Sequence, residues 1–366
     1  MQRRTFSAAL AAPFLIAAGA RPTRASAQNR LKTADADEGL ALQRAYALRD
    51  DAMRFADEAA ARQGVPREWA RGAIGQALFN PTSQRLMRPA PRSFTKNWAV
   101  YRSRFIDNVR IRAATDFWSA NRATLARAQA DYGVPPEIIV GIIGVETIYG
   151  RNMGNFRVLD ALATLTFDFP PEHPRFTQRQ AYFAGELGSF LALCHRTNLP
   201  PGELLGSYAG AMGMPQFMPS SWLRYAVDYD HDGRIDLAGS DQDAIGSVAN
   251  YFRGYGWTPG MPTTYPVRLA PEADMASLLE PDILPTFTAT EFSARGALPQ
   301  AGGDRHRGPL ALVELQNGDP SRPGNAPTYV AGTENLYVVT RYNHSAYYAM
   351  AVIELGEAAA AAMARG

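Results

Sequence analysis

The stretch from Pro135 to Asn155 constrains the fold most, and it reads P-P-E-I-I-V-G-I-I-G-V-E-T-I-Y-G-R-N-M-G-N. Two prolines at its start and apolar residues at helical spacing predict a buried helix that stops near Gly150. One stripe of this helix carries Ile138, Ile142, Glu146 and Tyr149. A carboxylate therefore lies on an apolar helix face.

Glu146 is the first candidate for a reactive group. Burying a carboxylate costs several kcal/mol unless it is paired, so Glu146 needs a cationic partner or a raised pKa. A carboxylic acid that stays protonated near neutral pH can serve as the general acid in glycosidic bond cleavage. The structural alternative is a Glu146 that pairs with Arg151 or points to solvent. Gly141 and Gly144 predict the close approach of another backbone or of a polymer.

The first 27 residues have the three parts of a secretory signal. Residues 1–4 carry two arginines, residues 8–20 form a short apolar run, and residues 25–27 form a small-residue cleavage site. The apolar run is too short to span a bilayer, and no cysteine for a lipid anchor follows the cleavage site. We therefore expect a soluble protein exported to the periplasm. The arginine pair also resembles a twin-arginine signal, with a chance pair as the alternative.

The remaining chain of about 340 residues is long enough for two or three packed units. Its 37 basic and 35 acidic residues give a formal net charge of +2, which does not suggest a nucleic-acid-binding protein. The single cysteine, Cys194, lies at helical spacing with Leu187, Phe190 and Leu191. We expect a buried structural thiol and no disulfide within the chain.

Helical patterns dominate the first two thirds of the chain. Residues 39–80 read as helical, with an interruption at Gly64-Val65-Pro66, and residues 81–97 read as a connecting loop. Further helices are predicted at 98–133, 158–165, 176–196 and 244–254.

The segment from Gly206 to Trp222, G-S-Y-A-G-A-M-G-M-P-Q-F-M-P-S-S-W, is too rich in glycine and proline for a regular helix or strand. Hydroxyl, amide and aromatic groups in it are of the kind that bind carbohydrate; they belong to Ser207, Tyr208, Gln216 and Phe217. The alternative is a structural loop that packs Met212, Met214 and Met218 into the core.

The segment from Asp228 to Asp243, D-Y-D-H-D-G-R-I-D-L-A-G-S-D-Q-D, matches the opening of an EF-hand calcium loop. The matching residues are Asp228, Asp230, Asp232, Gly233, Arg234 (through its carbonyl), Ile235 and Asp236. The twelfth position is Gly239 instead of glutamate, so Asp243 or Asp241 would have to close a longer loop. We expect a structural calcium site, with a solvated Asp-Gly turn as the alternative.

Beyond Trp257 the composition changes, and strands are predicted at 264–269, 310–315, 328–330 and 336–340. These strands form a small β subdomain. A helical pattern returns at residues 341–355, and its start holds a cluster of polar and aromatic residues: Tyr342, Asn343, His344, Tyr347 and Tyr348. His344 is expected to be structural.

Four motifs in this order resemble the lytic murein transglycosylase B family: G-V-E-T-I-Y-G-R-N-M-G, the Gly206–Trp222 segment, the Asp-rich loop before D-A-I-G-S-V-A-N-Y-F, and R-Y-N-H-S. The resemblance covers residues 40–360. It implies a mainly α (α+β) fold, in which a lysozyme-like helical core carries an extra helical domain and a small β subdomain. The implied domains are a signal peptide at 1–27, a helical region and loop at 28–97, a catalytic core at 98–259 with an EF-hand-like loop at 228–243, a β subdomain at 260–340, and a returning helix at 341–366.

The resemblance also implies an activity. The family cleaves the β-1,4 bond between N-acetylmuramic acid (MurNAc) and N-acetylglucosamine in peptidoglycan without hydrolysis, which leaves a 1,6-anhydromuramoyl end. Glu146 would be the single general acid and base. The implied substrate-binding residues are Tyr101, Ser207, Gln216, Tyr251, Tyr342, Asn343 and Tyr348. The implied calcium ligands are Asp228, Asp230, Asp232, the Arg234 carbonyl and Asp243, with no organic cofactor.

The sequence leaves two alternative functions open. One is a hydrolytic muramidase of the lysozyme type, which needs a second carboxylate, and the nearest acids downstream are Asp160 and Asp168. The other is a peptidoglycan-binding or scaffold protein without activity. The expected partners are glycan strands and other cell-wall enzymes, with no nucleic acid and no transmembrane segment, and the expected state is a monomer.

Overall fold

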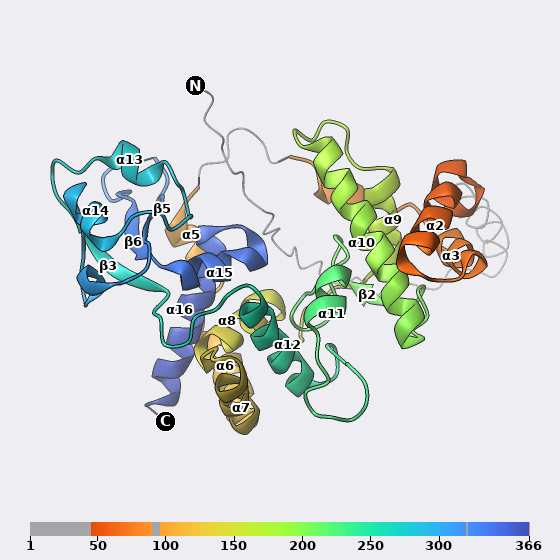
Figure 1. Cartoon of the computed structure of the whole chain (residues 1–366), viewed down its shortest axis with the longest axis horizontal. Helices are drawn as coiled ribbons and strands as arrows, with labels where there is room; N and C mark the ends of the chain where they lie inside the picture. Colours follow the sequence, from red (N-terminus) through yellow and green to blue (C-terminus); the bar gives the residue numbers. More distant parts are fainter. Residues whose placement is uncertain (1–44, 90–95, 320, 366) are drawn as a thin grey trace, which may run out of the picture. The chain divides into compact units, whose positions relative to one another are not determined.

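The computed structural model describes residues 45–89, 96–319 and 321–365, so the predicted signal peptide at 1–27 lies outside the described residues. The described residues divide into two compact units (Figure 1). Unit 1 holds those of Pro91–Asn152 and Tyr225–Gly366, and unit 2 holds those of Ala12–Ala90 and Met153–Arg224. The chain thus leaves unit 1 after the Glu146 region and returns to it before the Asp-rich loop.

Unit 2 is built almost wholly of helices. Its elements are a short 3-10 helix at Tyr46–Leu48, α2 (Asp50–Gln63), α3 (Arg67–Gly75), α4 (Pro81–Leu86), β1 (Phe156–Arg157), α9 (Val158–Phe167), α10 (Phe176–Thr197), β2 (Leu205–Gly206) and α11 (Pro219–Tyr225), which ends at the unit boundary. Gly64 ends α2 in the left-handed conformation, which confirms the interruption predicted there. The expected loop at 81–97 is partly wrong, because Asn80 caps α4 with its side chain and Pro81 occupies the first helical position.

Unit 1 combines helices with one small sheet. Its helices are α5 (Trp98–Arg102), α6 (Asn108–Ala120), α7 (Arg122–Tyr132), α8 (Pro136–Thr147), α12 (Asp241–Gly254), α13 (Met275–Leu279), α14 (Ala289–Ala294), a 3-10 helix at Gly303–Arg305, α15 (Glu334–Asn343) and α16 (Ala346–Met363). Helices α6, α8 and α16 pack against one another (Figure 1). The predicted Glu146 helix is confirmed as α8.

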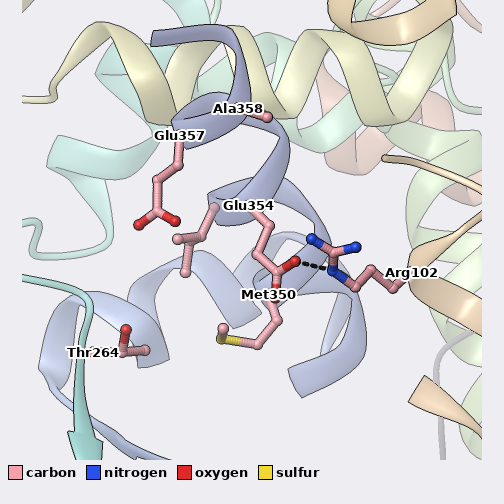
Figure 2. Close-up of a pocket in the computed structure, with 7 residues that line it drawn as sticks. Arg102, Thr264, Met350, Glu354, Glu357 and Ala358 are labelled. Carbon is pink, nitrogen blue, oxygen red and sulfur yellow. Dashed lines mark hydrogen bonds and ion pairs between the residues drawn. The ribbon is translucent and has the colours of Figure 1, made fainter. Parts of the chain in front are cut away.

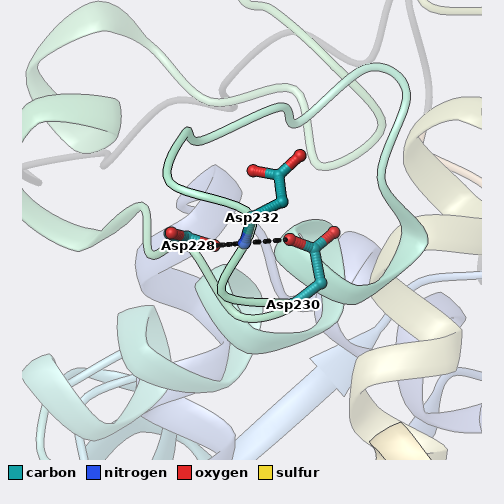
Figure 3. A group of neighbouring side chains, drawn as sticks. All are labelled: Asp228, Asp230 and Asp232. Atoms are coloured by element: carbon teal, nitrogen blue, oxygen red, sulfur yellow. Dashed lines mark hydrogen bonds between the residues drawn. The ribbon is translucent and has the colours of Figure 1, made fainter.

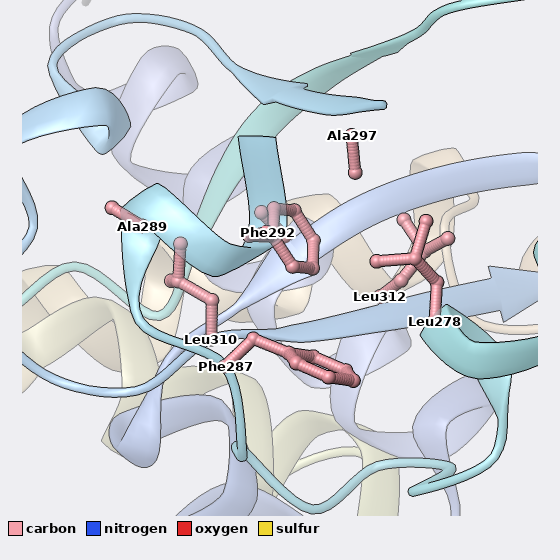
Figure 4. Packing of buried hydrophobic residues seen from close by; sticks show 8 residues of the cluster. Leu278, Phe287, Ala289, Phe292, Ala297, Leu310 and Leu312 are labelled. Carbon is pink, nitrogen blue, oxygen red and sulfur yellow. The ribbon is translucent and has the colours of Figure 1, made fainter. Parts of the chain in front are cut away.

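The sheet of unit 1 has the strand order β4-β3-β6-β5, and its neighbours are antiparallel. The strands are β3 (Thr264–Leu269), β4 (Ala297–Pro299), β5 (Ala311–Leu315) and β6 (Thr328–Gly332). Figure 4 shows the apolar core of this part, in which Phe287 and Phe292 pack with Leu278, Leu310 and Leu312. The mainly helical fold with small antiparallel sheets is as expected.

The strand predicted at 336–340 is wrong, because these residues lie within α15. Leu336, Val338, Val339 and Thr340 are all buried, and this continuous run of apolar and β-branched residues is typical of strands. The helix is set instead by Thr333, whose hydroxyl accepts a hydrogen bond from the backbone nitrogen of Asn335.

Glycines bring α8 and α16 close together. A Cβ on Gly141 would lie 2.2 Å from the carbonyl oxygen of Val352, and a Cβ on Gly356 would lie 2.0 Å from that of Glu137. Only glycine permits this approach at either position. The sequence predicted that another backbone or a polymer comes close to Gly141, and the structure shows that it is another backbone.

No described helix is both long enough and apolar enough to cross a membrane.

Candidate active site

The end of α8, directly after Glu146, has an uncommon backbone. Ile148 and Tyr149 have φ values of 51° and 56°, and Gly150 has a φ of 83°. A β-branched residue in the left-handed region costs about 1–3 kcal/mol, and such strain concentrates at functional sites. The backbone nitrogens of Ile148 and Tyr149 close the helix by donating to the carbonyls of Gly144 and Ile143.

The packing of α8 on α16 places a tyrosine hydroxyl at Glu146. The two helices run antiparallel: residue 137 of α8 lies against residue 356 of α16, and residue 141 lies against residue 352. The same pairing, continued along both helices, places residue 146 against residue 347, next to Tyr348. The hydroxyl of Tyr348, a residue only 2% exposed, donates a hydrogen bond to Oε1 of Glu146.

Glu146 as a residue is partly buried, and its carboxyl is surrounded by protein. Burial raises its pKa from 4.5 to about 7, and the hydrogen bond from Tyr348 opposes part of this rise. Glu146 contacts Tyr348, and among the described residues it forms no ion pair with Arg151. The structural alternative, a pair with Arg151, is therefore wrong, and of the two options for a buried carboxylate the raised pKa is the one found.

Aromatic rings extend from this carboxyl. The ring of Tyr342 stacks on that of Tyr348 with centroids 6.2 Å apart, and it contacts Tyr251 at 4.8 Å. The pKa values of Tyr342 and Tyr348 are raised first by burial and then by the charge of Glu146. The Tyr251 hydroxyl donates to the Arg341 carbonyl at 2.9 Å. Helices α12, α15 and α16 thus bring three predicted residues together at Glu146.

Tyr101, on α5, is the fourth aromatic residue of this group. Its pKa is raised mainly by burial and then by the charge of Glu146. Its hydroxyl is buried and has no hydrogen-bond partner among the described residues. The ring packs on Trp98 at 6.2 Å and on Tyr347 at 5.8 Å. Trp98 and Tyr347 were not among the residues predicted for the site, although the spacing of Trp98 and Tyr101 places these two on one helix face.

Asn343 is the last residue of α15, and His344 follows it in the left-handed conformation. The Asn343 side chain is partly buried and forms no hydrogen bond with the described residues. His344 is exposed, and its Nδ1 contacts an Arg341 guanidinium nitrogen at 2.9 Å. His344 ends the helix, in line with the structural role expected for it.

The other two predicted substrate-binding residues, Ser207 and Gln216, lie in unit 2. Oγ of Ser207 accepts hydrogen bonds from the nitrogens of Ala209 and Ala211, at 3.3 and 3.0 Å. Nε2 of Gln216 donates to the carbonyls of Met153 and Gly213, at 3.0 and 2.9 Å, and Gln216 has a φ of 52°. Both side chains hold the Gly206–Trp222 loop in shape.

The structural reading of this loop holds for part of it, while Met218 is only partly buried. Met212, Met214 and Phe217 are buried, so the ring of Phe217 belongs to the core and is not a binding face. Ser207, Tyr208 and Gln216 are only partly buried. These three are the groups through which the loop can contact a ligand.

Three carboxylates of the Asp-rich loop gather in unit 1 (Figure 3). One oxygen each of Asp228, Asp230 and Asp232 lies within 4.8 Å of the others. Asp228 accepts hydrogen bonds from the nitrogens of Asp232 and Gly233, at 3.1 and 2.9 Å. Nε of Arg234 lies 3.1 Å from Oδ2 of Asp232, which offsets part of the negative charge. The loop therefore presents the oxygen ligands that a hard cation prefers.

Asp243 is engaged differently. Its Oδ1 accepts from the backbone nitrogen of Tyr229 at 2.7 Å, and its Oδ2 accepts from that of Asp236 at 2.7 Å. It is 1% exposed, and burial raises its pKa. The Asp243 carboxylate holds the two sides of the loop together through backbone amides.

The acids considered as a second carboxylate lie in unit 2, where both have partners. Asp160 accepts from the nitrogen of Leu78 at 2.9 Å and pairs with Arg157 at 3.1 Å. Asp168 pairs with Arg49 at 2.7 Å and accepts from the Tyr46 hydroxyl at 2.6 Å. Each stabilises the packing of its own unit.

The Cys194 thiol is buried, as predicted, and burial raises its pKa to about 12. A thiol with such a pKa stays protonated at neutral pH and is a poor nucleophile.

A surface hollow of about 500 Å³ lies along α16 (Figure 2). Arg102 and Glu354 form an ion pair at its side, and Met350, Ile353 and Thr264 add to its lining. None of the residues predicted for the site lines this hollow.

Comparison with known proteins shows extensive similarity to enzymes of cell-wall cleavage. Residues 47–357 match the family described as transglycosylase SLT domain. The chain is 40% identical over 326 residues to membrane-bound lytic murein transglycosylase B of Escherichia coli (strain K12), which covers 87% of this chain and 84% of that protein.

Solved structures agree with this similarity. The E. coli lytic transglycosylase SLT35 in complex with calcium is 39% identical, with a TM-score of 0.73 over 86% of this chain and 94% of that chain. SltB3 of Pseudomonas aeruginosa in complex with NAG-anhNAM-pentapeptide is 28% identical, with a TM-score of 0.68 over 86% of this chain and 78% of that chain. The protein thus belongs to the transglycosylase SLT domain family and is a lytic murein transglycosylase, an enzyme that cleaves peptidoglycan.

Proposed function

We propose that Glu146 acts alone as the general acid and then the general base in cleaving the MurNAc–GlcNAc β-1,4 bond. The observation that carries this proposal is the position of its carboxyl, which is largely surrounded by protein and has a pKa of about 7. At neutral pH such a group is protonated in a fraction of the enzyme molecules, and it can lose and regain its proton during turnover.

In the first step the Glu146 carboxylic acid gives its proton to the glycosidic oxygen, and the bond from that oxygen to C1 of MurNAc breaks. In the second step the Glu146 carboxylate takes the proton of the MurNAc C6 hydroxyl, and the C6 oxygen bonds to C1. The product is a 1,6-anhydromuramoyl end, and Glu146 regains its proton. The Tyr348 hydroxyl stabilises the carboxylate between the two steps.

This scheme needs one carboxylate, whereas a retaining hydrolase needs two about 5 Å apart. Asp160 and Asp168 are each held by an arginine and a hydrogen-bond donor within unit 2. The SltB3 complex with an anhydromuramoyl ligand supports the same product for this chain.

We propose that Tyr101, Tyr251, Tyr342, Asn343 and Tyr348 line the glycan-binding surface around Glu146 in unit 1. Aromatic faces and side-chain amides suit sugar rings and their hydroxyl and acetamido groups. The Tyr101 hydroxyl and the Asn343 amide have no hydrogen bonds with described residues, so both are available to a substrate. Ser207 and Gln216 of unit 2 are proposed as further contacts with glycan.

We propose that calcium binds the loop at 228–243 in a structural role. The three clustered carboxylates fit a hard cation, and the calcium complex of SLT35 supports the assignment. Asp228, Asp230, Asp232 and the Arg234 carbonyl would be the ligands. The Asp243 carboxylate accepts hydrogen bonds from two backbone amides, so it would close the site only if calcium replaces these hydrogen bonds.

We also propose that the protein works as a monomer in the periplasm, exported through the signal in residues 1–27. The substrate of its relatives lies in the cell envelope, which agrees with this location.

The test is mass spectrometry of fragments released from purified peptidoglycan. The wild-type enzyme should release fragments lighter by one water than hydrolytic products, and Glu146→Gln should release none. Glu137→Gln, a change on the same helix, is the matched control and should remain active. Activity in Glu146→Gln would remove Glu146 from its proposed role.

A further inference from the structure

Glu186 is a buried carboxylate of unit 2 that the proposed chemistry does not use. It lies on α10 and is 5% exposed. Burial raises its pKa, and among the described residues the groups that oppose this rise are hydrogen-bond donors and not a cation. Burying a charge without a cation is unfavourable unless hydrogen bonds satisfy it. The donors around Glu186 therefore explain its position.

Two residues supply these donors. The backbone nitrogen of Ser220 donates to Oε2 of Glu186 at 2.9 Å, and the Ser220 hydroxyl donates to Oε1 at 2.7 Å. The Tyr182 hydroxyl, one turn earlier on the same helix, is the third donor. Both carboxylate oxygens are thus engaged by Ser220, and this contact at two points holds Ser220 against α10.

Ser220 lies where the Gly206–Trp222 loop ends and α11 begins. Its backbone N–H is in the first turn of α11, where such groups have no partner within the helix. The start of the loop is held separately by the pairing of β1 with β2. Ser207 and Gln216 lie between these two anchors. Glu186 therefore anchors the second end of the segment that carries both side chains.

The backbone of Gln216 shows why this anchor matters. Its φ of 52° lies in the left-handed region, which a residue other than glycine keeps only when the surrounding structure holds it. The Gln216 side chain donates to the Met153 carbonyl, and the contact between Glu186 and Ser220 fixes the chain four positions further on. Without that contact the chain after Gln216 is free to move, and its amide moves with it.

We propose that Glu186 is a positioning residue for glycan binding, because it holds Ser220 so that the loop presents Ser207 and Gln216 to the glycan. This proposal rests on the proposed function, which makes these two side chains glycan contacts. Glu186 bonds to the loop and has no hydrogen bond with Glu146. Its loss should therefore weaken glycan binding without changing the chemical step.

The test measures kcat and KM separately on soluble glycan strands of defined length. Glu186→Ala should raise KM by about tenfold and leave kcat within about twofold, since interactions made equally in the bound and transition states appear in KM. Glu186→Gln should restore most of the wild-type KM, because its amide can accept from the Ser220 nitrogen and donate to the Ser220 hydroxyl. Glu186→Asp keeps the charge but is one methylene shorter, so it should resemble Glu186→Ala.

A second variant and a control separate this contact from a general loss of stability. Glu186→Ala/Ser220→Ala should raise KM no more than Glu186→Ala alone, because both side chains act through one contact. The matched control Asp57→Ala removes a partly buried acid of unit 2 whose partners are Arg67 and Arg71, and it should keep the wild-type KM.

An unchanged KM in Glu186→Ala, while Ser207→Ala raises KM, would overturn this proposal and leave the proposed function standing. An unchanged KM in Ser207→Ala would instead refute the glycan contact itself, which is part of the proposed function. If Glu186→Ala does not fold, Ser220→Ala decides, because Ser220 is exposed and its loss leaves the core intact. A raised KM with kcat retained would then support the anchor, and an unchanged KM would reject it.

Discussion

The hydrogen bond from Tyr348 to Glu146 gives a prediction about pH. Tyr348→Phe removes the donor and keeps the ring that stacks on Tyr342. The hydroxyl favours the charged carboxylate, so its loss should raise the pKa of Glu146 above the present value of about 7.

The expected size follows from the strength of the bond. A hydrogen bond to a charged group contributes about 1.5–3 kcal/mol, and about 1.4 kcal/mol corresponds to one pKa unit. Water will replace part of the lost interaction, because Glu146 as a whole residue is only partly buried. We therefore expect a rise of about one unit.

The assay is the pH dependence of kcat/KM, measured from released fragments between pH 5 and 9. The free enzyme needs protonated Glu146, so kcat/KM should be constant at low pH and fall as pH rises through the pKa. In Tyr348→Phe this fall should move up by about one pH unit. Tyr149→Phe, which removes a hydroxyl that donates to the Val140 carbonyl, should leave the fall in place. A fall that stays in place or moves to lower pH in Tyr348→Phe would refute the reasoning.

Three further predictions concern single side chains. Tyr101→Phe removes a buried hydroxyl without a partner, so it should raise the free energy of unfolding by up to about 1 kcal/mol and also raise KM; a loss of stability would contradict this. The raised pKa of Glu146 means that the folded state binds more protons than the unfolded state between pH 4.5 and 7, so stability falls as pH rises through this range. Urea unfolding should therefore show that Glu146→Gln stabilises more at pH 8 than at pH 4, by at most about 3 kcal/mol, and equal effects at both pH values would exclude the raised pKa. Removing calcium with a chelator should lower the melting temperature by several degrees in the wild type but not in Asp228→Ala. Asp243→Asn should lower the melting temperature even without calcium, because it weakens the acceptor of hydrogen bonds from two backbone amides.

Much of the helical layout was predictable because the residues at helix ends are local signals. Gly64 ends α2 and Pro136 begins α8, as the sequence indicated. The strand expected at 336–340 failed because a buried apolar run has the same appearance in a strand and in a buried helix. The local signal that distinguishes the helix from a strand is Thr333. Its hydroxyl caps the start of α15 by accepting a hydrogen bond from the backbone nitrogen of Asn335.

The candidate site was predictable in part. The helical spacing of the apolar residues around Glu146 identified it as an acid on an apolar face, and burial accounts for the raised pKa of Glu146. Its partner Tyr348 is 202 positions away, so no local pattern could reveal the hydrogen bond between them. The backbone contacts of Asp243 were hidden for a different reason: in a sequence, an aspartate that accepts hydrogen bonds from backbone amides cannot be told from a calcium ligand.

The most direct measurement of the central claim is digestion of purified peptidoglycan in water labelled with ¹⁸O. If the C6 hydroxyl attacks C1 with Glu146 as the base, the muramoyl ends will be anhydro forms that carry no label. Hydrated muramoyl ends with one ¹⁸O atom at C1 would show that water attacks, and would contradict the single-carboxylate account.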